Sequence, residues 1–257
     1  MLPVKLPLSV AIITYNEERR LPACLASVAF AAEVVVVDSE STDRTVAIAE
    51  QSGAKVQRQP WRGFGLQKQS AIDLCTQPYI LVLDADERVA PPTAIELATL
   101  IQSGLIHDAY SLPRKNYFLG RWIKHAGWWP DRVVRLFQKG RATMSANLVH
   151  ESLRVSGSTG ELQNPLLHYA TRDLEQTMNK MNSYSTSGAE ELWREGKQAS
   201  VAKALARGAW AFFYNYGIRL GFLDGAEGLI IAVSDASNKF FKYAKLYALN
   251  KKGEDDA

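Results

Sequence analysis

The stretch Tyr79–Glu87, with the sequence YILVLDADE, is a short apolar run that ends at two aspartates, Asp84 and Asp86. In an extended segment successive side chains point to opposite faces, so these two carboxylates project in the same direction. Such a pair suits Mg²⁺ or Mn²⁺, whose remaining positions are usually filled by substrate phosphate and water. The alternative is an ordinary turn, where Asp is common because it bonds its own backbone. The residues before the stretch discriminate between the two interpretations.

Strand-like and helix-like patterns alternate before this stretch. Leu8–Thr14 and Glu33–Asp38 are nearly continuous apolar runs, which is typical of parallel strands buried on both faces. A segment with helical spacing of apolar residues follows each of them, and Lys55–Gln57 is a third short strand-like run. The pattern predicts a βαβ series and therefore an α/β fold.

Polar residues follow three of the predicted strands, as TYNEE (Thr14–Glu18), DSESTD (Asp38–Asp43) and DADE (Asp84–Glu87). Ligands of open α/β sheets gather beyond the carboxyl ends of the strands, so we expect these segments to share one site. The glycine patterns of dinucleotide-binding sites and of P-loops are absent from the sequence. Acidic and amide groups instead suit a base and ribose beside a metal-held diphosphate.

The composition excludes several classes of protein. With 257 residues, of which 47% are hydrophobic and 22% charged, the chain can bury a full core. Its net charge of +3 is too small to indicate nucleic-acid binding. The two cysteines, Cys24 and Cys75, lie in apolar helical patterns, so we expect buried thiols and a reducing compartment. The first residues lack the features of a signal peptide, and we expect a cytoplasmic protein.

Three segments of the first half carry a family resemblance. AIITYNEE, VVVVDSESTDRT and LVLDADERV resemble the nucleotide-sugar-binding half of inverting family 2 glycosyltransferases, which have the GT-A fold, a Rossmann-like mixed sheet. Later segments, WWPDRVVRLF, LVHESL and PLLHYATRDL, look like the branch that adds glucose in β-1,4 linkage to the inner core of lipopolysaccharide. The resemblance implies a GT-A catalytic domain at residues 1–170 and a helical C-terminal extension at 171–257. It also implies UDP-glucose as donor and an inner-core heptose, or a similar lipid-linked saccharide, as acceptor.

The resemblance further implies the residues that bind the donor. The expected nucleotide-binding residues are Thr14, Tyr15, Asn16, Glu17, Asp38, Gln67, Lys68 and Asp84. Asp86, directly or together with Asp84, would hold Mg²⁺ or Mn²⁺ against the diphosphate, and His168 is a candidate third ligand. The alternatives are a turn residue for Asp38, a solvated helix surface for Lys68 and a hydrogen-bonded structural residue for His168.

An inverting transfer needs a base that takes the proton of the acceptor hydroxyl. Glu151, in LVHESL, stands about where the family places its catalytic acidic residue, although His150 precedes it where the family often has a second acid. Asp131, in WWPDR, is the rival candidate, with a turn aspartate as its structural alternative. Arg132 and Arg135 flank an apolar strand and could bind phosphates or form salt bridges.

The C-terminal extension combines aromatic and basic residues over Ala202–Leu249. Charged residues interrupt every apolar run, so no segment predicts a membrane span. Helices of this composition suit the headgroup region of a membrane, here the cytoplasmic face of the inner membrane, or packing on the catalytic domain or on a second subunit of a homo-oligomer.

Two other functions are compatible with a DxD motif. A phosphatase of the haloacid dehalogenase type also places this motif after an apolar strand, but on its first strand, whereas two βα units precede Asp84 here. A non-catalytic, membrane-associated nucleotide-binding protein is the second alternative. The resemblance favours the glycosyltransferase over both.

Overall fold

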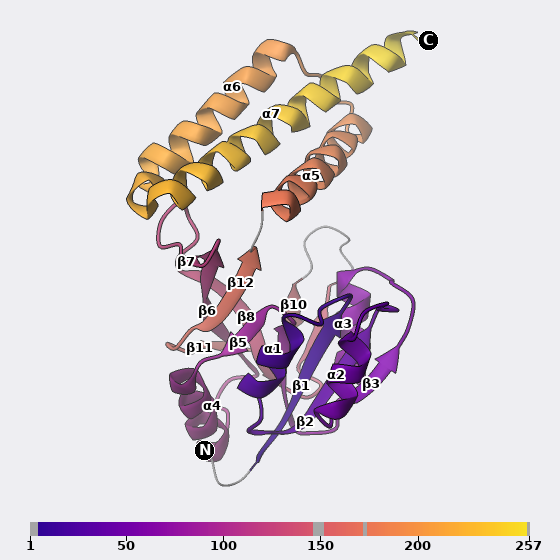
Figure 1. Cartoon of the computed structure of the whole chain (residues 1–257), viewed down its shortest axis with the longest axis vertical. Coiled ribbons are helices and arrows are strands. Elements are labelled where there is room, and N and C mark those ends of the chain that lie inside the picture. Colours follow the sequence, from indigo (N-terminus) through magenta and orange to yellow (C-terminus); the bar gives the residue numbers. More distant parts are fainter. Residues whose placement is uncertain (1–4, 146–151, 172–173, 256–257) are drawn as a thin grey trace. The chain divides into compact units, whose positions relative to one another are not determined.

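The computed structural model describes residues 5–145, 152–171 and 174–255 of the chain. The chain divides into two compact units. The first unit comprises Met1–Lys115 and Asp131–His168, and the second comprises Asn116–Pro130 and Tyr169–Ala257. The ribbon of each unit is shown in Figure 1, and each is described by itself.

The first unit opens with alternating strands and helices: β1 (Leu6–Thr14), α1 (Leu21–Ser27), β2 (Ala31–Asp38), α2 (Thr45–Gln51), β3 (Lys55–Arg58), α3 (Phe64–Asp73) and β4 (Tyr79–Asp84). Then follow β5 (Glu87–Val89), α4 (Pro91–Ser103), β6 (Ala109–Phe118), β7 (Arg121–Trp122), β8 (Asp131–Gln138), β9 (Ala142–Met144), β10 (Leu153–Val155), β11 (Thr159–Glu161) and β12 (Leu166–Thr171). Of these, β7 and the C-terminal ends of β6 and β12 belong to the second unit. The helices of the second unit are α5 (Leu174–Arg194), α6 (Val201–Phe212), η1 (Phe213–Ile218), η2 (Gly221–Asp224) and α7 (Gly225–Asp255).

The main sheet is mixed, as the sequence predicts. Its strand order is β3-β2-β1-β4-β8-β6-β12-β5, with β7 and β11 paired to β6. The first four strands of this order are parallel, and β8 then runs antiparallel to both β4 and β6. Among the described residues a second, two-stranded sheet is formed by β9 and β10.

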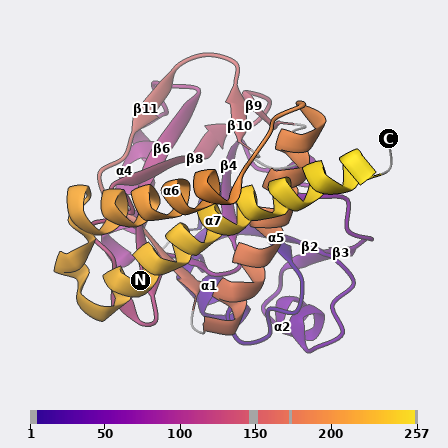
Figure 2. The ribbon, with the colours of Figure 1, turned by 90° about the horizontal axis from the view of Figure 1, so that it is seen from above.

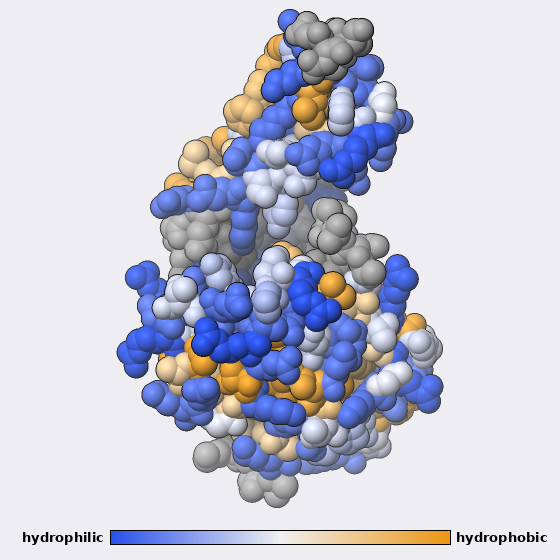
Figure 3. All heavy atoms as spheres, turned by 90° about the vertical axis from the view of Figure 1, so that its right-hand side faces the viewer, coloured by the Kyte–Doolittle hydropathy of each residue, from blue (hydrophilic) through white to orange (hydrophobic). Residues whose placement is uncertain are grey.

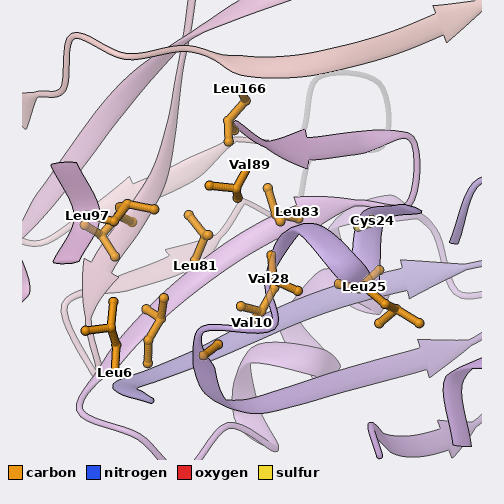
Figure 4. Close-up of a cluster of buried hydrophobic side chains, with 14 of the residues drawn as sticks. Leu6, Val10, Cys24, Leu25, Val28, Leu81, Leu83, Val89, Leu97 and Leu166 are labelled. Atoms are coloured by element: carbon orange, nitrogen blue, oxygen red, sulfur yellow. The ribbon is translucent and has the colours of Figure 1, made fainter. Parts of the chain in front are cut away.

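The central strands are buried on both faces, which explains their nearly continuous apolar sequences. In β4, Leu81 and Leu83 point into one cluster with α1 and α4, while Ile80 and Val82 point into another with α3. The first cluster is drawn in Figure 4. Full burial of one such side chain contributes about 2 kcal/mol to folding, so helices on both faces hold the sheet.

The strand register brings the predicted site segments to one edge. Thr14, the last residue of β1, is paired with Asp38, the last residue of β2. On the other side of β1, Ile13 is paired with Asp84, the last residue of β4. The three carboxyl ends therefore lie next to one another across the sheet.

The second unit contains three long helices. The helices α6 and α7 lie side by side (Figures 1 and 2) because α6 presents small residues to its neighbour. A Cβ placed on Gly208 would lie 3.1 Å from the Cβ of Phe240 and 3.2 Å from the carbonyl oxygen of Ala236. Ser200 caps α6 by accepting a hydrogen bond from the Lys203 N–H. Within the described part of the chain, no helix has the length and apolarity needed to cross a bilayer.

Candidate active site

Asp38 is a buried hydrogen-bond acceptor at the end of β2. The Thr14 hydroxyl donates to its Oδ2 over 2.9 Å, and the Ser41 N–H donates to its Oδ1 over 2.8 Å. The Ser41 hydroxyl donates to Oδ2 as well. Asp38 has no exposed surface, so its carboxylate fixes the ends of β1 and β2 from within the protein. Its contact with a bound base stays a prediction.

The loop after β1 is bonded to the loop after β2. The Asn16 N–H donates to the Ser41 hydroxyl over 2.8 Å, and the Asn16 side-chain oxygen accepts from the Thr42 N–H over 2.8 Å. One residue further, the Glu17 N–H donates to the Thr45 hydroxyl over 2.7 Å. Asn16 has a positive φ of 53°, a conformation that Asn adopts more readily than most residues. Two of the predicted nucleotide-binding segments thus form one bonded surface.

The helix α3 adds Gln67 to this surface. The Gln67 side-chain amide donates to the Ser39 hydroxyl over 2.9 Å and accepts from the Gln59 side-chain amide over 2.6 Å. Gln67 is fully buried, whereas Tyr15 on the first loop is 61% exposed. Tyr15 therefore offers an exposed ring to a ligand, and Gln67 fixes the position of α3.

Asp84, the first aspartate of the DxD motif, is paired with two cations. Its Oδ1 lies 2.9 Å from Lys68 Nζ, and its Oδ2 lies 2.6 Å from Arg135 Nη2. Burial alone would raise the pKa of Asp84, but the charges and hydrogen bonds of Arg135 and Lys68 outweigh it and hold the pKa well below its usual range. Lys68 is buried rather than solvated, so the surface interpretation of this lysine was wrong.

Glu87 forms ion pairs with Arg135, the partner of Asp84, and with a second arginine. Its carboxylate is fully buried and lies 2.7 Å from Arg135 and 3.4 Å from Arg114. Arg114 in turn donates to Asp131 Oδ2 from Nη2 over 2.6 Å and from Nε over 3.0 Å. The guanidinium of Arg135 keeps a raised pKa because Asp84 and Glu87 outweigh the effect of its own burial. We call these residues, together with Lys68, the ion-pair chain.

Asp131 is thereby the last carboxylate of the ion-pair chain. Two hydrogen bonds from one guanidinium already occupy Oδ2 of this carboxylate. This geometry suits a positioning residue better than a base. The assignment of Asp131 as the rival base stays a prediction.

Asp86, the second aspartate of the motif, lies beside His168. The Asp86 Oδ2 is 3.6 Å from His168 Nε2, and each side chain is 18% exposed. The neighbouring strands explain the approach, because His168 of β12 is paired in register with Glu87 of β5. The sequence proposed His168 as a candidate metal ligand, and the structure brings it to the side chain with which it would share the metal.

The donor groups at this corner fit a divalent cation whose coordination is completed by a substrate. Among the described residues, no group of three or more His, Cys, Asp and Glu side chains is arranged to hold a metal. Asp86 and His168 are two suitable ligands, and Mg²⁺ is usually held by one or two protein groups plus phosphates and water. Lys68 and Arg135 already neutralise the charge of Asp84. Asp84 is therefore less suited to bind a metal than Asp86.

Glu17 faces the same corner. Burial raises its pKa, Asp86 and Asp43 raise it further, and Arg20, whose Nη1 lies 3.4 Å from Glu17 Oε1, lowers it. The net effect is an increase above the ordinary value. Glu17 and Asp86 therefore place two negative charges near each other, which a cation would relieve.

A cavity of about 390 Å³ lies beside Asp84 within the first unit. Its volume is in the range of small-molecule sites. Its wall is formed by Lys68, Val82, Asp84, Arg114, residues 132–135, Met144, Ser152 and Leu153. Glu151 and His150 precede Ser152 in the sequence but lie outside the described residues. The assignment of Glu151 as base therefore stays a prediction.

The remaining candidates have structural contacts. Arg132 donates hydrogen bonds to the carbonyl oxygens of Leu162 and Ser111, and Arg135 belongs to the ion-pair chain. Both arginines therefore have contacts within the protein, as in the alternative to phosphate binding. Trp128 and Trp129, the adjacent tryptophans of the WWPDR segment, pack on other rings of the second unit. Trp128 lies against Phe118, and Trp129 against Trp122, in edge-to-face geometry.

No individual role was predicted for Glu87 or Arg114 from the sequence. Both are functional candidates because they connect Asp84 to Asp131 through buried charges. A weak signal was present, since Arg114 directly follows the buried residues Leu112 and Pro113 of β6, and a cation beside buried positions needs a carboxylate partner. The identity of that partner depends on strand order and could not be found locally.

Comparison with known proteins gives concordant results. The family model "Glycosyl transferase family 2" matches residues 9–153. The chain is 32% identical over 259 residues to the lipopolysaccharide core biosynthesis glycosyltransferase LpsC of Rhizobium meliloti, covering 96% of this chain and 94% of that protein. It is 34% identical over 257 residues to an uncharacterized glycosyltransferase of Rickettsia felis, covering 93% and 89%.

Among solved structures, the crystal structure of S. aureus TarS 1-349 aligns with 96% of this chain and 91% of its own, at 16% identity and a TM-score of 0.49. The family match covers more than half of the chain and includes all three strand ends described above. The chain belongs to glycosyl transferase family 2, and it is a glycosyltransferase with a mixed GT-A sheet and C-terminal helices.

Proposed function

We propose that the protein transfers a sugar from a nucleotide diphosphate donor, UDP-glucose, to a hydroxyl of a lipopolysaccharide inner-core heptose or a similar lipid-linked acceptor, with inversion at the anomeric carbon. The observation that carries the donor class is the convergence of three strand ends on one edge, with Asp86 and His168 3.6 Å apart. The acceptor class is supported by the similarity to LpsC over nearly the full length of both chains.

In this proposal the two aspartates of the motif have different tasks. Asp86 and His168 would hold Mg²⁺ or Mn²⁺, and the cation would supply positive charge against the departing nucleotide. Asp84 keeps the Lys68 ammonium and the Arg135 guanidinium in place at the edge of the cavity. Thr14, Tyr15, Asn16 and the α3 residue Gln67 form the surface against which the base and ribose bind.

Glu151 is the proposed base. It removes the proton of the acceptor hydroxyl while that oxygen attacks the anomeric carbon from the face opposite the leaving group. A carboxylate suits this task if it can approach the cavity wall, to which its neighbour Ser152 contributes. Asp131 is the less suitable base because Arg114 already occupies its Oδ2.

The test of donor binding is a calorimetric titration of UDP with and without Mn²⁺. Asp86→Asn is expected to lose the metal-dependent part of the affinity, at least about tenfold. Asp73→Asn is the matched control, because Asp73 lies on the surface of α3 and accepts a hydrogen bond from Gln69. Equal, metal-dependent affinities in both variants would exclude the assignment of Asp86.

The test of catalysis separates binding from turnover. Glu151→Gln is expected to keep UDP affinity and to lose transfer by more than about a hundredfold, whereas Glu50→Gln on the exposed surface of α2 keeps both. Nuclear magnetic resonance of the product reports the anomeric configuration. A product with the donor's configuration would contradict the inverting mechanism.

We also propose that the helices of the second unit contact a membrane surface. Most of the large hydrophobic side chains that are exposed in the described chain belong to this unit, among them Leu205, Trp210 and Phe213. Lys203 and Arg207 lie on α6 together with Leu205 and Trp210, and Phe213 directly follows this helix. This combination of cationic and hydrophobic side chains suits the headgroup region. Leu205→Ser with Phe213→Ser should lower co-sedimentation with lipid vesicles, while Ile95→Ser on α4 should not. The competing outcome is a second subunit, which analytical ultracentrifugation would detect.

A further inference from the structure

The segment between β3 and α3 exposes aromatic side chains on the catalytic unit itself. Trp61 and Phe64 are each 50% exposed, and Leu66 is 47% exposed. The two rings contact each other edge to face, with centroids 4.7 Å apart. We call Arg58–Leu66 the β3–α3 loop.

The charge around the β3–α3 loop has one sign. Residues 51–72 contain four Lys or Arg and no Asp or Glu. Lys68 is buried against Asp84, whereas Lys55, Arg58 and Arg62 are exposed. Long cationic side chains can place their apolar stems beside aromatic rings and keep their charges in a polar layer. The exposed surface of the loop is thus aromatic and cationic at once.

The loop borders the edge of the sheet that carries the candidate active site. It begins at the carboxyl end of β3, next to the end of β2, because Arg58 is paired in register with Asp38. Gln59 then connects it to Gln67, and Gln67 to Ser39. Figure 3 looks onto the side of the molecule that bears β3 and shows orange, apolar atoms interrupting a mostly blue surface.

We propose that the β3–α3 loop binds the headgroup region of a membrane that contains anionic lipids, with Trp61 and Phe64 inserted among the headgroups. Tryptophan is favoured at such interfaces because its ring is apolar at one end and polar at the other, and the exposed cations suit anionic headgroups. A protein partner fits less well, because three apolar side chains form a far smaller surface than the roughly 800 Å² that each partner of a stable complex buries. The loop would turn the donor edge towards a lipid-linked acceptor, a consequence that rests on the proposed function.

The experiment measures co-sedimentation of the full-length chain with vesicles of phosphatidylcholine alone and mixed with phosphatidylglycerol. Trp61→Ala with Phe64→Ala is expected to weaken binding to the mixed vesicles about tenfold, and Arg58→Gln with Arg62→Gln to remove most of the preference for the anionic lipid. Ile106→Ala is the control, since Ile106 is 87% exposed on the same unit but lies near Asp108. Thermal melting verifies that each variant is folded.

A second measurement separates lipid binding from the donor site. The fluorescence of Trp61 is obtained by subtracting the emission spectrum of the Trp61→Phe variant from that of the unchanged chain. This difference spectrum is expected to shift to shorter wavelength when mixed vesicles are added and to stay constant when UDP is added. UDP affinity and acceptor-free hydrolysis of UDP-glucose should not change in the Trp61→Ala, Phe64→Ala variant. Unchanged vesicle binding in that variant would overturn the proposal, as would a loss of UDP affinity without a loss of lipid binding. Neither result would affect the assignment of Asp86 and Glu151.

Discussion

Two aspartates, the buried Asp38 and the partly exposed Asp84, end the two strands that flank β1 and are stabilised in different ways. Asp38 is surrounded by hydroxyl and N–H donors of its own and the adjacent loop. Asp84 is held by the charges of Lys68 and Arg135, which come from a helix and from a distant strand. Neutral donors fix the loops around Asp38, whereas the surroundings of Asp84 depend on balanced charge. Substitutions should therefore have larger effects around Asp84 than around Asp38.

The largest effect is expected from Arg135→Met. It would leave Asp84 and the fully buried Glu87 with less compensation, which we expect to lower the free energy of unfolding by about 3–5 kcal/mol. Arg132→Met is the matched control, since the Arg132 side chain is 27% exposed, and about 1 kcal/mol is expected for it. Urea unfolding followed by circular dichroism measures both. Similar losses of unfolding free energy in the two variants would show that Arg135 of the ion-pair chain is no more important for stability than Arg132 outside it.

A smaller loss is expected from Asp38→Ala. The substitution leaves the Thr14 hydroxyl and two donors of Ser41 without their acceptor, which should lower the free energy of unfolding by about 2–3 kcal/mol. Asp73→Ala on the surface of α3 should change it by less than about 0.5 kcal/mol. If Asp38→Ala cost more than Arg135→Met, the ranking of the two aspartates' surroundings would be reversed.

The pH dependence of Asp84 gives the next effect. An unfolded Asp ionises near pH 4, and the cations hold the pKa of Asp84 below that in the folded chain. Its contribution to stability is therefore present above about pH 4 and lost as the pH falls through the lower, folded pKa. The difference in unfolding free energy between the unchanged chain and Asp84→Asn should stay constant from neutral pH to about pH 5 and shrink by about 1–2 kcal/mol in stronger acid. A difference that grows in acid would contradict the assignment of the charge.

Glu17 should show the opposite and smallest effect. Because burial, Asp86 and Asp43 raise its pKa, the folded chain favours the protonated form, and stability is lost as the pH rises through the folded pKa. Glu17→Gln should therefore stabilise the protein at neutral pH by less than about 1 kcal/mol and have no such effect near pH 4. Unfolding at the two pH values, with Glu50→Gln as control, measures this. Stabilisation only at the lower pH would exclude the proposed repulsion.

Local sequence predicts the surroundings of Asp38 well and those of Asp84 and Glu87 poorly. The end of β2 and the donors around Asp38 are largely within DSES, four consecutive residues, so a strand followed by polar residues was enough to predict a polar loop there. The partners of Glu87 are separated from it by 27 and 48 positions. They meet because β8 is inserted between β4 and β6, and no periodicity within a short window encodes that order.

The C-terminal helices were predicted from the sequence, and the second unit also contains a segment outside them. Residues 171–257 were expected to be helical, and α5, α6 and α7 lie there. The segment Asn116–Pro130 also belongs to this unit, although it lies within the range assigned to the catalytic domain. Asp224 accepts hydrogen bonds from the N–H groups of Lys124 and His125. This contact over about a hundred positions has no counterpart in local pattern, and the domain boundaries themselves stay a prediction.

The places where the chain passes from one unit to the other have a consequence for its evolution and engineering. Two of the passages, Lys115 to Asn116 and His168 to Tyr169, fall inside the strands β6 and β12 rather than in glycine-rich linkers. Recombination at a single crossover therefore could not exchange the whole helical unit. A chimaera that borrows the helices of a relative must also borrow residues 116–130 and match two strands in register. The helical unit of such proteins should accordingly diverge by gradual substitution more readily than by domain shuffling.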